Sequence, residues 1–241
     1  MAKRPIFIPK PESSPFVEEI DVDFEWHSGF AKSQAQKSIR SLHESAAQKG
    51  ITPVLEISSK SIDSLGTALS AFNLHITIDT GRTISVECAF QGSKVFKDGG
   101  PYIDLYDKSS REAKTDLRLK NSGELTAFSL MGEQFPTRPV TAFYDWLYLR
   151  ALFDNQEEAR QLLSYNGFSD IAFNPEKSIN CQARSAALFV AMSKNNSIDL
   201  KKIVKDKNYY LRLVTGEDVK TPVQLLLISN EKHYNPMSEP R

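Results

Sequence analysis

The sequence carries a carboxylate, an amide and an amine within one short segment, Ile84 to Phe96, which reads ISVECAFQGSKVF. If this segment is one helix, Glu87, Gln91 and Lys94 share a stripe, because residues three and four apart lie on one face. The other sides are apolar, which is typical of a buried helix. Burial moves the pKa values of carboxyl and amino groups toward neutrality. The stripe could therefore supply an acid–base group and a nucleophile for cleaving a glycosidic bond.

A second interpretation of the stripe stays open at this point. A buried salt bridge that only joins neighbouring helices would leave the same pattern. Glycine-rich nucleotide loops and the GxSxG and HExxH motifs are absent from the sequence. The cysteines, Cys88 and Cys181, and the four scattered histidines lack the spacing of metal ligands. We therefore expect no metal, no other cofactor and no disulfide, which favours a reducing cytoplasm.

The composition predicts one globular domain with no overall attraction to nucleic acid. The chain has 241 residues, of which 40% are hydrophobic, and 30 basic residues balance 30 acidic ones. Between Lys177 and Lys220, however, basic residues outnumber acidic ones nine to four. This excess could face phosphates or could simply be solvated surface. Prolines interrupt the N-terminus and no apolar run reaches membrane-spanning length, so we expect a cytoplasmic protein without membrane contact.

The hydrophobic patterns predict a mainly helical α/β or α+β fold, a single domain around a small sheet over residues 20–241, preceded by an extended arm over 1–19. Ser33 and Gln36 have the spacing of a capping box, and Gly50 marks the end of the same helix. The expected elements are a helix over 31–50, a strand over 52–61, two strands around a turn at 79–81, a short helix over 110–118, a long helix after Pro139 that breaks near Asp154, a buried helix over 181–193 that begins near Ser178 or Asn180, and two short strands or a strand and a helix over 209–229.

Two short segments of the sequence resemble a known family. The run LSAF at 69–72, a hairpin, and VECAFQGSK at 86–94 are similar to the NADAR pattern, in which L-S-N-F precedes a helix with E-H-x-x-Q-x-x-K. Ala71 stands in place of the usual Asn and Cys88 in place of the usual His. The late aspartate and Trp-Gly motif of many members has no legible counterpart. The resemblance is more specific to the branch encoded beside DarT-type DNA ADP-ribosyltransferase toxins, and it covers about residues 20–195. The segments that carry it are GFAKSQAQKSIRSLH, EISSKS, GGPYIDLY, TAFYDWLY and NPEKSINCQARSAALF.

The resemblance implies an antitoxin that hydrolyses the N-glycosidic bond between ADP-ribose and guanine in DNA. Its implied partners are ADP-ribosylated DNA, ADP-ribose and the cognate toxin. Glu87 would be the general acid–base, and Lys94 or Lys60 would bind the ribose or phosphate or attack the sugar. The implied ADP-ribose contacts are Ser59, Phe72, Gln91, Trp146, Asn180, Gln182 and Arg184.

Two alternatives remain from the sequence. One is an N-glycosidase for a free riboflavin-pathway intermediate or another ribotide. The other is a non-catalytic module that binds modified DNA or the toxin. The basic excess near the C-terminus would favour the DNA substrate if it lay beside the site.

Overall fold

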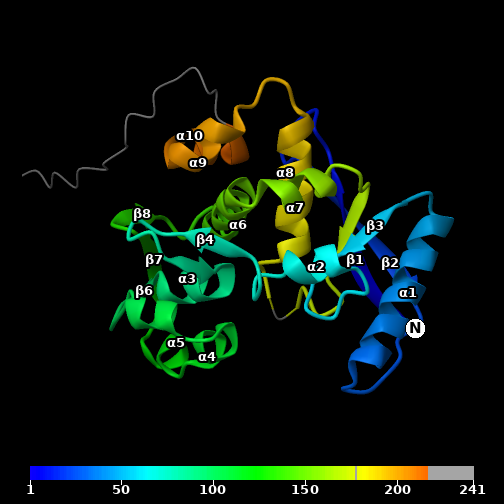
Figure 1. Ribbon diagram of the computed structural model, residues 1–241, viewed down its shortest axis with the longest axis horizontal. Helices are drawn as coiled ribbons and strands as arrows, with labels where there is room; N and C mark the ends of the chain where they lie inside the picture. Colours follow the sequence, from blue (N-terminus) through cyan, green and yellow to red (C-terminus); the bar gives the residue numbers. More distant parts are fainter. Residues whose placement is uncertain (177, 217–241) are drawn as a thin grey trace, which may run out of the picture.

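The computed structural model describes residues 1–176 and 178–216 and has an α+β fold, as expected (Figure 1). Its helices are α1 (Lys32–Gln48), α2 (Ser64–Ala68), α3 (Val86–Gly92), the 3₁₀ helix η1 (Ile103–Asp107), α4 (Ser110–Thr115), α5 (Arg118–Asn121), α6 (Ala142–Asp154), α7 (Gln156–Leu162), α8 (Gln182–Lys194), α9 (Leu200–Lys205) and α10 (Lys207–Thr215). Its strands are β1 (Ala2–Pro9), β2 (Val17–Phe24), β3 (Val54–Glu56), β4 (His75–Thr77), β5 (Thr83–Ser85), β6 (Lys94–Phe96), β7 (Leu125–Leu130), β8 (Glu133–Phe135) and β9 (Gly167–Ser169).

The largest sheet has the strand order β2-β1-β9-β3 and corrects the expectation for the N-terminus. Residues 1–19 form β1, a turn over 11–15 and the start of β2, so they are not an arm outside the domain. Strand β1 pairs with β2 along its whole length and with β9 at Phe7 and Phe168. Ile6 and Phe7 are buried, so apolar burial holds this strand inside the sheet. Strands β3 and β9 are parallel, with Glu56 opposite Ser169.

Two smaller sheets surround the segment that carries the polar stripe. Strands β4 and β5 form the expected hairpin, whose turn contains Gly81 with φ of +78°. Strands β6, β7 and β8 form a three-stranded antiparallel sheet. The expected single helix over 84–96 is therefore wrong at both ends: only α3 is helical, while β5 precedes it and β6 follows it. Pairing of β6 with β7, more than 30 residues later, overrides the local helical pattern.

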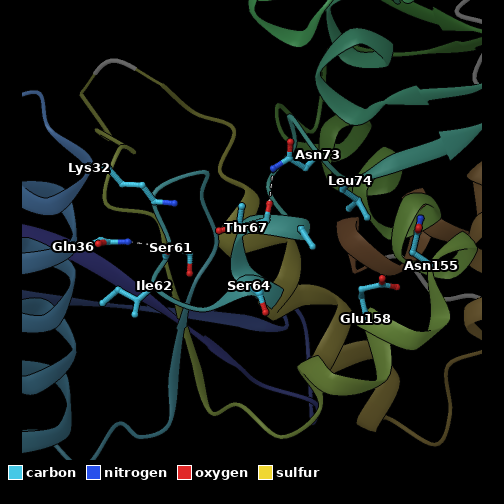
Figure 2. Close-up of a pocket in the computed structure, with 11 residues that line it drawn as sticks. Lys32, Gln36, Ser61, Ile62, Ser64, Thr67, Asn73, Leu74, Asn155 and Glu158 are labelled. Atoms are coloured by element: carbon cyan, nitrogen blue, oxygen red, sulfur yellow. Dashed lines mark hydrogen bonds between the residues drawn. The ribbon is translucent and has the colours of Figure 1, made fainter.

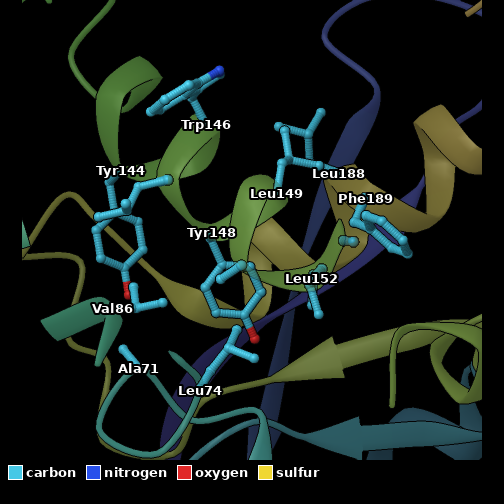
Figure 3. Packing of buried hydrophobic residues seen from close by; sticks show 14 of the residues in the cluster. Ala71, Leu74, Val86, Tyr144, Trp146, Tyr148, Leu149, Leu152, Leu188 and Phe189 are labelled. Carbon is cyan, nitrogen blue, oxygen red and sulfur yellow. The ribbon is translucent and has the colours of Figure 1, made fainter. Parts of the chain in front are cut away.

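Helices α6 and α8 form the centre of the molecule. They pack against each other, and most of their residues belong to the main hydrophobic core. Figure 3 shows Tyr148, Leu149 and Leu152 of α6 beside Leu188 and Phe189 of α8. The break between α6 and α7 at Asn155 and the buried helix after residue 181 confirm the predictions.

The helix ends differ in part from the predicted signals. The N-cap of α1 is Ala31, whose methyl group cannot accept a hydrogen bond, so the capping box at Ser33 and Gln36 is wrong. Gly50 follows this helix with φ of +79°, as expected. Residues 207–215 form α10 where a strand was expected to begin, and 217–229 lie outside the described residues. In the described part of the chain, no helix is long and apolar enough to cross a membrane.

Candidate functional site

A cleft of about 740 Å³ brings most of the predicted site residues together. Its walls come from α3, β6, β7, α6 and the loops that precede α2, α6 and α8. The predicted residues that line it are Ser59, Phe72, Glu87, Gln91, Lys94, Asn180 and Gln182. This volume lies within the usual range for small-molecule sites.

Helix α3 begins at the cleft because a serine caps it. Ser85 Oγ accepts a hydrogen bond from the backbone nitrogen of Cys88 at 3.1 Å. The nitrogen of Glu87 donates to the carbonyl of Ala71 at 2.9 Å, which joins the helix start to the LSAF segment. The other end is fixed by close packing: a Cβ atom at Gly92 would lie 2.4 Å from the ring of Tyr106. These contacts hold α3 in one position.

The three polar residues of the stripe form one hydrogen-bonded chain. Gln91 Nε2 donates to Glu87 Oε1 at 2.8 Å, and Lys94 Nζ donates to Gln91 Oε1 at 2.7 Å. Lys94 is the first residue of β6, yet its side chain reaches back over α3, with Nζ 4.6 Å from the centre of the Phe90 ring. Burial lowers the pKa of Lys94 from its ordinary value, although the Glu87 charge opposes this. The amine is therefore nearer to its neutral, nucleophilic form than a surface lysine.

Lys114 of α4 supplies a cation at the cleft that sequence reasoning missed. Its Nζ is 3.8 Å from Glu87 Oε2 and 5.2 Å from the centre of the Phe72 ring. The lysine side chain is more than half exposed, so the contact with Glu87 is a weak ion pair rather than a fixed one. A mobile cation here could meet a phosphate.

Tyr144 of α6 also lines the cleft, although the helical pattern marks it only as one of several core aromatics. Its ring meets Phe90 edge-on, with 5.0 Å between centres. Burial, followed by the charge of Glu87, raises the pKa of Tyr144 well above its usual value. The hydroxyl is therefore a proton donor that stays neutral beside a carboxylate.

Gln182 joins three segments at the cleft wall. Its Oε1 accepts from the nitrogen of Ala71 at 2.7 Å, and its Nε2 donates to the carbonyl of Ile57 at 2.6 Å and to Asp170 Oδ2 at 3.0 Å. Asn180 differs, because its Oδ1 is buried and has no hydrogen-bond partner among the described residues. An orphan buried acceptor is costly, so Asn180 is well suited to receive a donor from a ligand.

Three predicted site residues do not line the cleft. Lys60 lies on an exposed turn after β3, where its backbone nitrogen donates to Ser58 Oγ at 3.2 Å. Trp146 is buried in the core, where its Nε1 donates to the carbonyl of Ile203 at 3.0 Å (Figure 3). Arg184 pairs with Asp145 at 2.6 Å and so ties α8 to α6. Each of these side chains has a structural place that local spacing could not distinguish from a site.

Asp170 is a second acidic residue on the cleft wall, and no spacing pattern in the sequence marks it. It directly follows β9. Its Oδ1 accepts from the backbone nitrogen of Ala172 at 3.0 Å, in addition to the bond from Gln182. Burial raises the pKa of Asp170 to about 6. The cleft is therefore lined by two carboxyl groups, Glu87 and Asp170.

The described basic residues of the segment 177–220 do not line the cleft. Helices α9 and α10 pack against α6, on the side away from α3 (Figure 1). Lys202 lies over the ring of Tyr209, and Lys207 donates to the carbonyl of Gln134 at 2.8 Å. Lys177 and 217–220 lie outside the described residues. The described lysines of α9 and α10 thus give no support to a phosphate-facing surface at the site.

A separate surface cavity of about 600 Å³ lies among α1, α2 and α7 (Figure 2). Amide and hydroxyl side chains make up much of its lining, and all three amides already serve the fold. Asn155 Nδ2 donates to the carbonyls of His75 and Ala151, both at 2.8 Å. Gln36 Nε2 donates to the carbonyl of Ser61 at 3.5 Å, and Asn73 Nδ2 donates to that of Thr67 at 2.8 Å. Lys32 and Glu158 are its charged members. The acid–base groups described above are in the other cleft.

Comparison with known protein families identifies the family of the chain. A family model described as DarT1-associated NADAR antitoxin matches residues 2–224. A search of curated proteins finds no match. The family match covers nearly all of the chain, including every residue that lines the cleft. The chain therefore belongs to the family of DarT1-associated NADAR antitoxins.

Proposed function

We propose that the protein is an N-glycosidase that removes ADP-ribose from guanine bases of DNA and so reverses the action of a DarT-type toxin. The observation that carries this proposal is the chain Glu87–Gln91–Lys94 at the surface of the 740 Å³ cleft. It places a carboxylate and a partly desolvated amine within reach of one substrate atom. An antitoxin of this family that only masked its target would have no use for that pair.

Glu87 is the proton carrier in this mechanism. Its Oε1 is oriented by Gln91, which leaves Oε2 for the substrate and for Lys114. A carboxyl group in this position can give a proton to a departing guanine amine and later take one from water.

Lys94 is the nucleophile. Its neutral amine adds to C1 of the ribose, and the bond between C1 and the guanine nitrogen breaks. Of the two amine protons, one goes to the ring oxygen as the ring opens and one to the departing guanine, both through Glu87. The product is a Schiff base between Lys94 and C1. Water then hydrolyses it to the aldehyde of ADP-ribose and the free lysine amine, so one water is consumed for each bond cleaved.

The other lining residues are assigned to recognition. Asn180 offers its unpartnered oxygen to a donor such as a ribose hydroxyl. Phe72 and Phe90 provide apolar faces for a ring, and Lys114 provides a charge for the diphosphate. The Asp170 carboxylate, which lines the same cleft, suits the positive charge that develops at C1 during bond cleavage.

The test is release of ADP-ribose from a guanosine-ADP-ribosylated oligonucleotide by the purified protein. Free ADP-ribose and the restored oligonucleotide should appear in equal amounts, followed by mass spectrometry. The same assay with a free pyrimidine ribotide separates a metabolite glycosidase, which would cleave the ribotide and leave the oligonucleotide intact. Binding of the modified oligonucleotide without release of ADP-ribose would instead reveal a masking module and overturn the proposal.

A further inference from the structure

A carboxyl group that this reaction does not use lies directly behind the cleft wall. Glu56, the last residue of β3, has only 2% of its surface exposed. Its Oε1 accepts from Ser58 Oγ at 2.7 Å and from the backbone nitrogen of Ile171 at 2.9 Å. Its Oε2 lies 2.6 Å from Ser169 Oγ. Glu56 therefore holds the residues on both sides of Asp170.

We propose that Glu56 is a positioning residue for Asp170, holding the chain at residues 169 and 171 so that the Asp170 carboxylate faces the cleft. Successive side chains at a strand end point in opposite directions, so contacts behind the wall at 169 leave the side chain of 170 for the other side. Bonds from Ala172 and Gln182 then hold that carboxylate from the cleft side. The inference rests on the proposed function where it assigns Asp170 to the substrate.

The backbone around Glu56 is itself fixed. A Cβ atom at Gly66 of α2 would lie 1.9 Å from the carbonyl oxygen of Glu56, so the backbones of α2 and of the end of β3 pack with no room for a side chain between them. The parallel pairing of Glu56 with Ser169 fixes the other side. A carboxyl group on such a rigid base can set the position of a neighbouring segment.

The hydrogen-bonded chain continues away from the cleft to α1. His43 Nε2 lies 2.8 Å from Ser169 Oγ, and His43 and Glu56 both line a separate cavity of about 300 Å³. Burial lowers the pKa of His43 to about 4, so its imidazole is neutral at pH 7 and can accept from Ser169. Ser169 Oγ and Glu56 Oε2 are 2.6 Å apart, and either oxygen can be the hydrogen-bond donor. A protonated Glu56 can therefore donate to Ser169 while Ser169 donates to His43.

The charges around the pair favour a proton on Glu56 and a negative charge on Asp170. Burial and then the Asp170 charge raise the pKa of Glu56 to about 8, above that of Asp170. The charge of Lys114 on α4 opposes in part the effect of burial on the pKa of Asp170. Cys181, before α8, adds no charge, because burial raises the pKa of its thiol. Asp63, before α2, lines the cavity beside His43. The hydrogen bonds of Glu56 to residues 58, 169 and 171 are called the clamp below. At pH 7 Glu56 is neutral, and the single negative charge of the Glu56–Asp170 pair, on Asp170, faces the substrate.

The experiment compares two substitutions of Glu56 by carboxyl-carbon NMR on protein labelled with [¹³C]aspartate. The Asp170 resonance is assigned by its loss in Asp170→Asn. Glu56→Gln keeps the clamp, because an amide can accept from Ser58 and Ile171 and donate to Ser169. Asp170 should then titrate as in the wild type, but without the second inflection near pH 8 that ionisation of Glu56 causes.

Glu56→Ala removes the clamp, so the Asp170 midpoint should fall by about one pH unit as water enters behind the wall. An unchanged midpoint in this variant overturns the proposal. If Glu56→Ala does not fold, Ser169→Ala removes the contacts of Ser169 Oγ to Glu56 Oε2 and His43 Nε2, leaves the Oε1 contacts of Glu56 in place, and should shift the midpoint in the same direction. An unchanged midpoint there overturns it equally.

Kinetics on the ADP-ribosylated oligonucleotide complete the test. Glu56→Ala should lower kcat by about tenfold or more with a smaller change in KM, and Glu56→Gln should recover most of that loss. Wild-type kcat in Glu56→Ala would show that the reaction does not use the position of Asp170, which overturns the inference. A wild-type protein without glycosidase activity would refute the proposed function, while the NMR titration would still decide whether Glu56 positions Asp170.

Discussion

Glu87 and Lys94 are joined through a single amide and do not touch each other. Gln91 donates to the carboxylate and accepts from the amine, so its two ends fix both groups at once. A direct salt bridge would hold the lysine in its charged form. The intervening amide keeps the two groups close while leaving the amine free to lose its proton.

Replacing Glu87 with glutamine should abolish most of the activity without unfolding the protein. The amide has nearly the same shape but cannot carry a proton, so the rate of ADP-ribose release should fall by about 10²-fold or more. The exposed Glu124 provides a matched control, because Glu124→Gln makes the same chemical change at a residue that does not line the cleft. Equal rates for Glu87→Gln and Glu124→Gln would remove Glu87 from the mechanism.

Trapping with borohydride should identify Lys94 as the nucleophile. Reduction of the Schiff base in the presence of ADP-ribose should leave a stable adduct on the peptide that contains Lys94. The adduct should vanish in Lys94→Arg, since a guanidinium stays charged. Lys60→Arg is the control, because Lys60 lies outside the cleft and its substitution should leave the adduct intact. Wild-type hydrolysis with no adduct on any lysine would leave Glu87 and water as the mechanism.

Glu56 should make the protein less stable as the pH rises from 6.5 to 8. Its folded pKa of about 8 lies above the unfolded value of 4.5, so in this window only the folded state holds the proton. The stabilisation is complete below pH 4.5 and is lost as the pH passes 8. The free energy of unfolding should therefore fall by up to about 1.4 kcal/mol per pH unit.

Urea unfolding at several pH values measures this slope. Glu56→Gln has no proton to lose and should show a flatter dependence between pH 6.5 and 8. Identical slopes in the two proteins would mean that Glu56 is already ionised in the folded state.

Gly92→Ala should destabilise the protein even though alanine is the better helix former. In an open helix the change would stabilise by roughly 0.5–1 kcal/mol. Here the new methyl group would overlap the ring of Tyr106, so a net loss of about 1–3 kcal/mol is expected. Thermal unfolding gives the sign directly, and a higher Tm would show that α3 does not pack as closely as described.

Trp146→Phe should lower stability while leaving substrate affinity unchanged. The indole fills the core and donates to the carbonyl of Ile203, so the loss should be about 1–3 kcal/mol. Phe72→Ala, at the cleft, should instead raise KM for the modified oligonucleotide. A raised KM in Trp146→Phe at full stability would return Trp146 to the site.

The sequence predicted those parts that depend on local patterns. The buried helix α8 and the broken pair α6 and α7 follow from uninterrupted apolar periodicity, which long helices display clearly. The contact between Glu87 and Gln91 follows from their spacing of four residues, which α3 preserves.

The remaining features depend on contacts between distant segments. Lys94 reaches Gln91 from a strand rather than from a helix, because β6 pairs with β7. Asp170 is one aspartate in a loop, and only the pairing of β9 with β3 brings it to the cleft. Trp146 and Tyr144 are two residues apart on one helix, and no local signal tells which ring meets the cleft and which enters the core.

The pairing of β1 with β9 determines when the largest sheet can first be completed during synthesis. Phe7 leaves the ribosome early, but its sheet partner Phe168 emerges only after two thirds of the chain has been made. Until then the nascent strand β1 has β2 on one side and an open edge on the other. The cleft wall at Asp170 and Gln182 is translated later still. A cleft wall that contains Gln182 therefore exists only in chains translated through that residue, so the proposed activity cannot precede this point of synthesis.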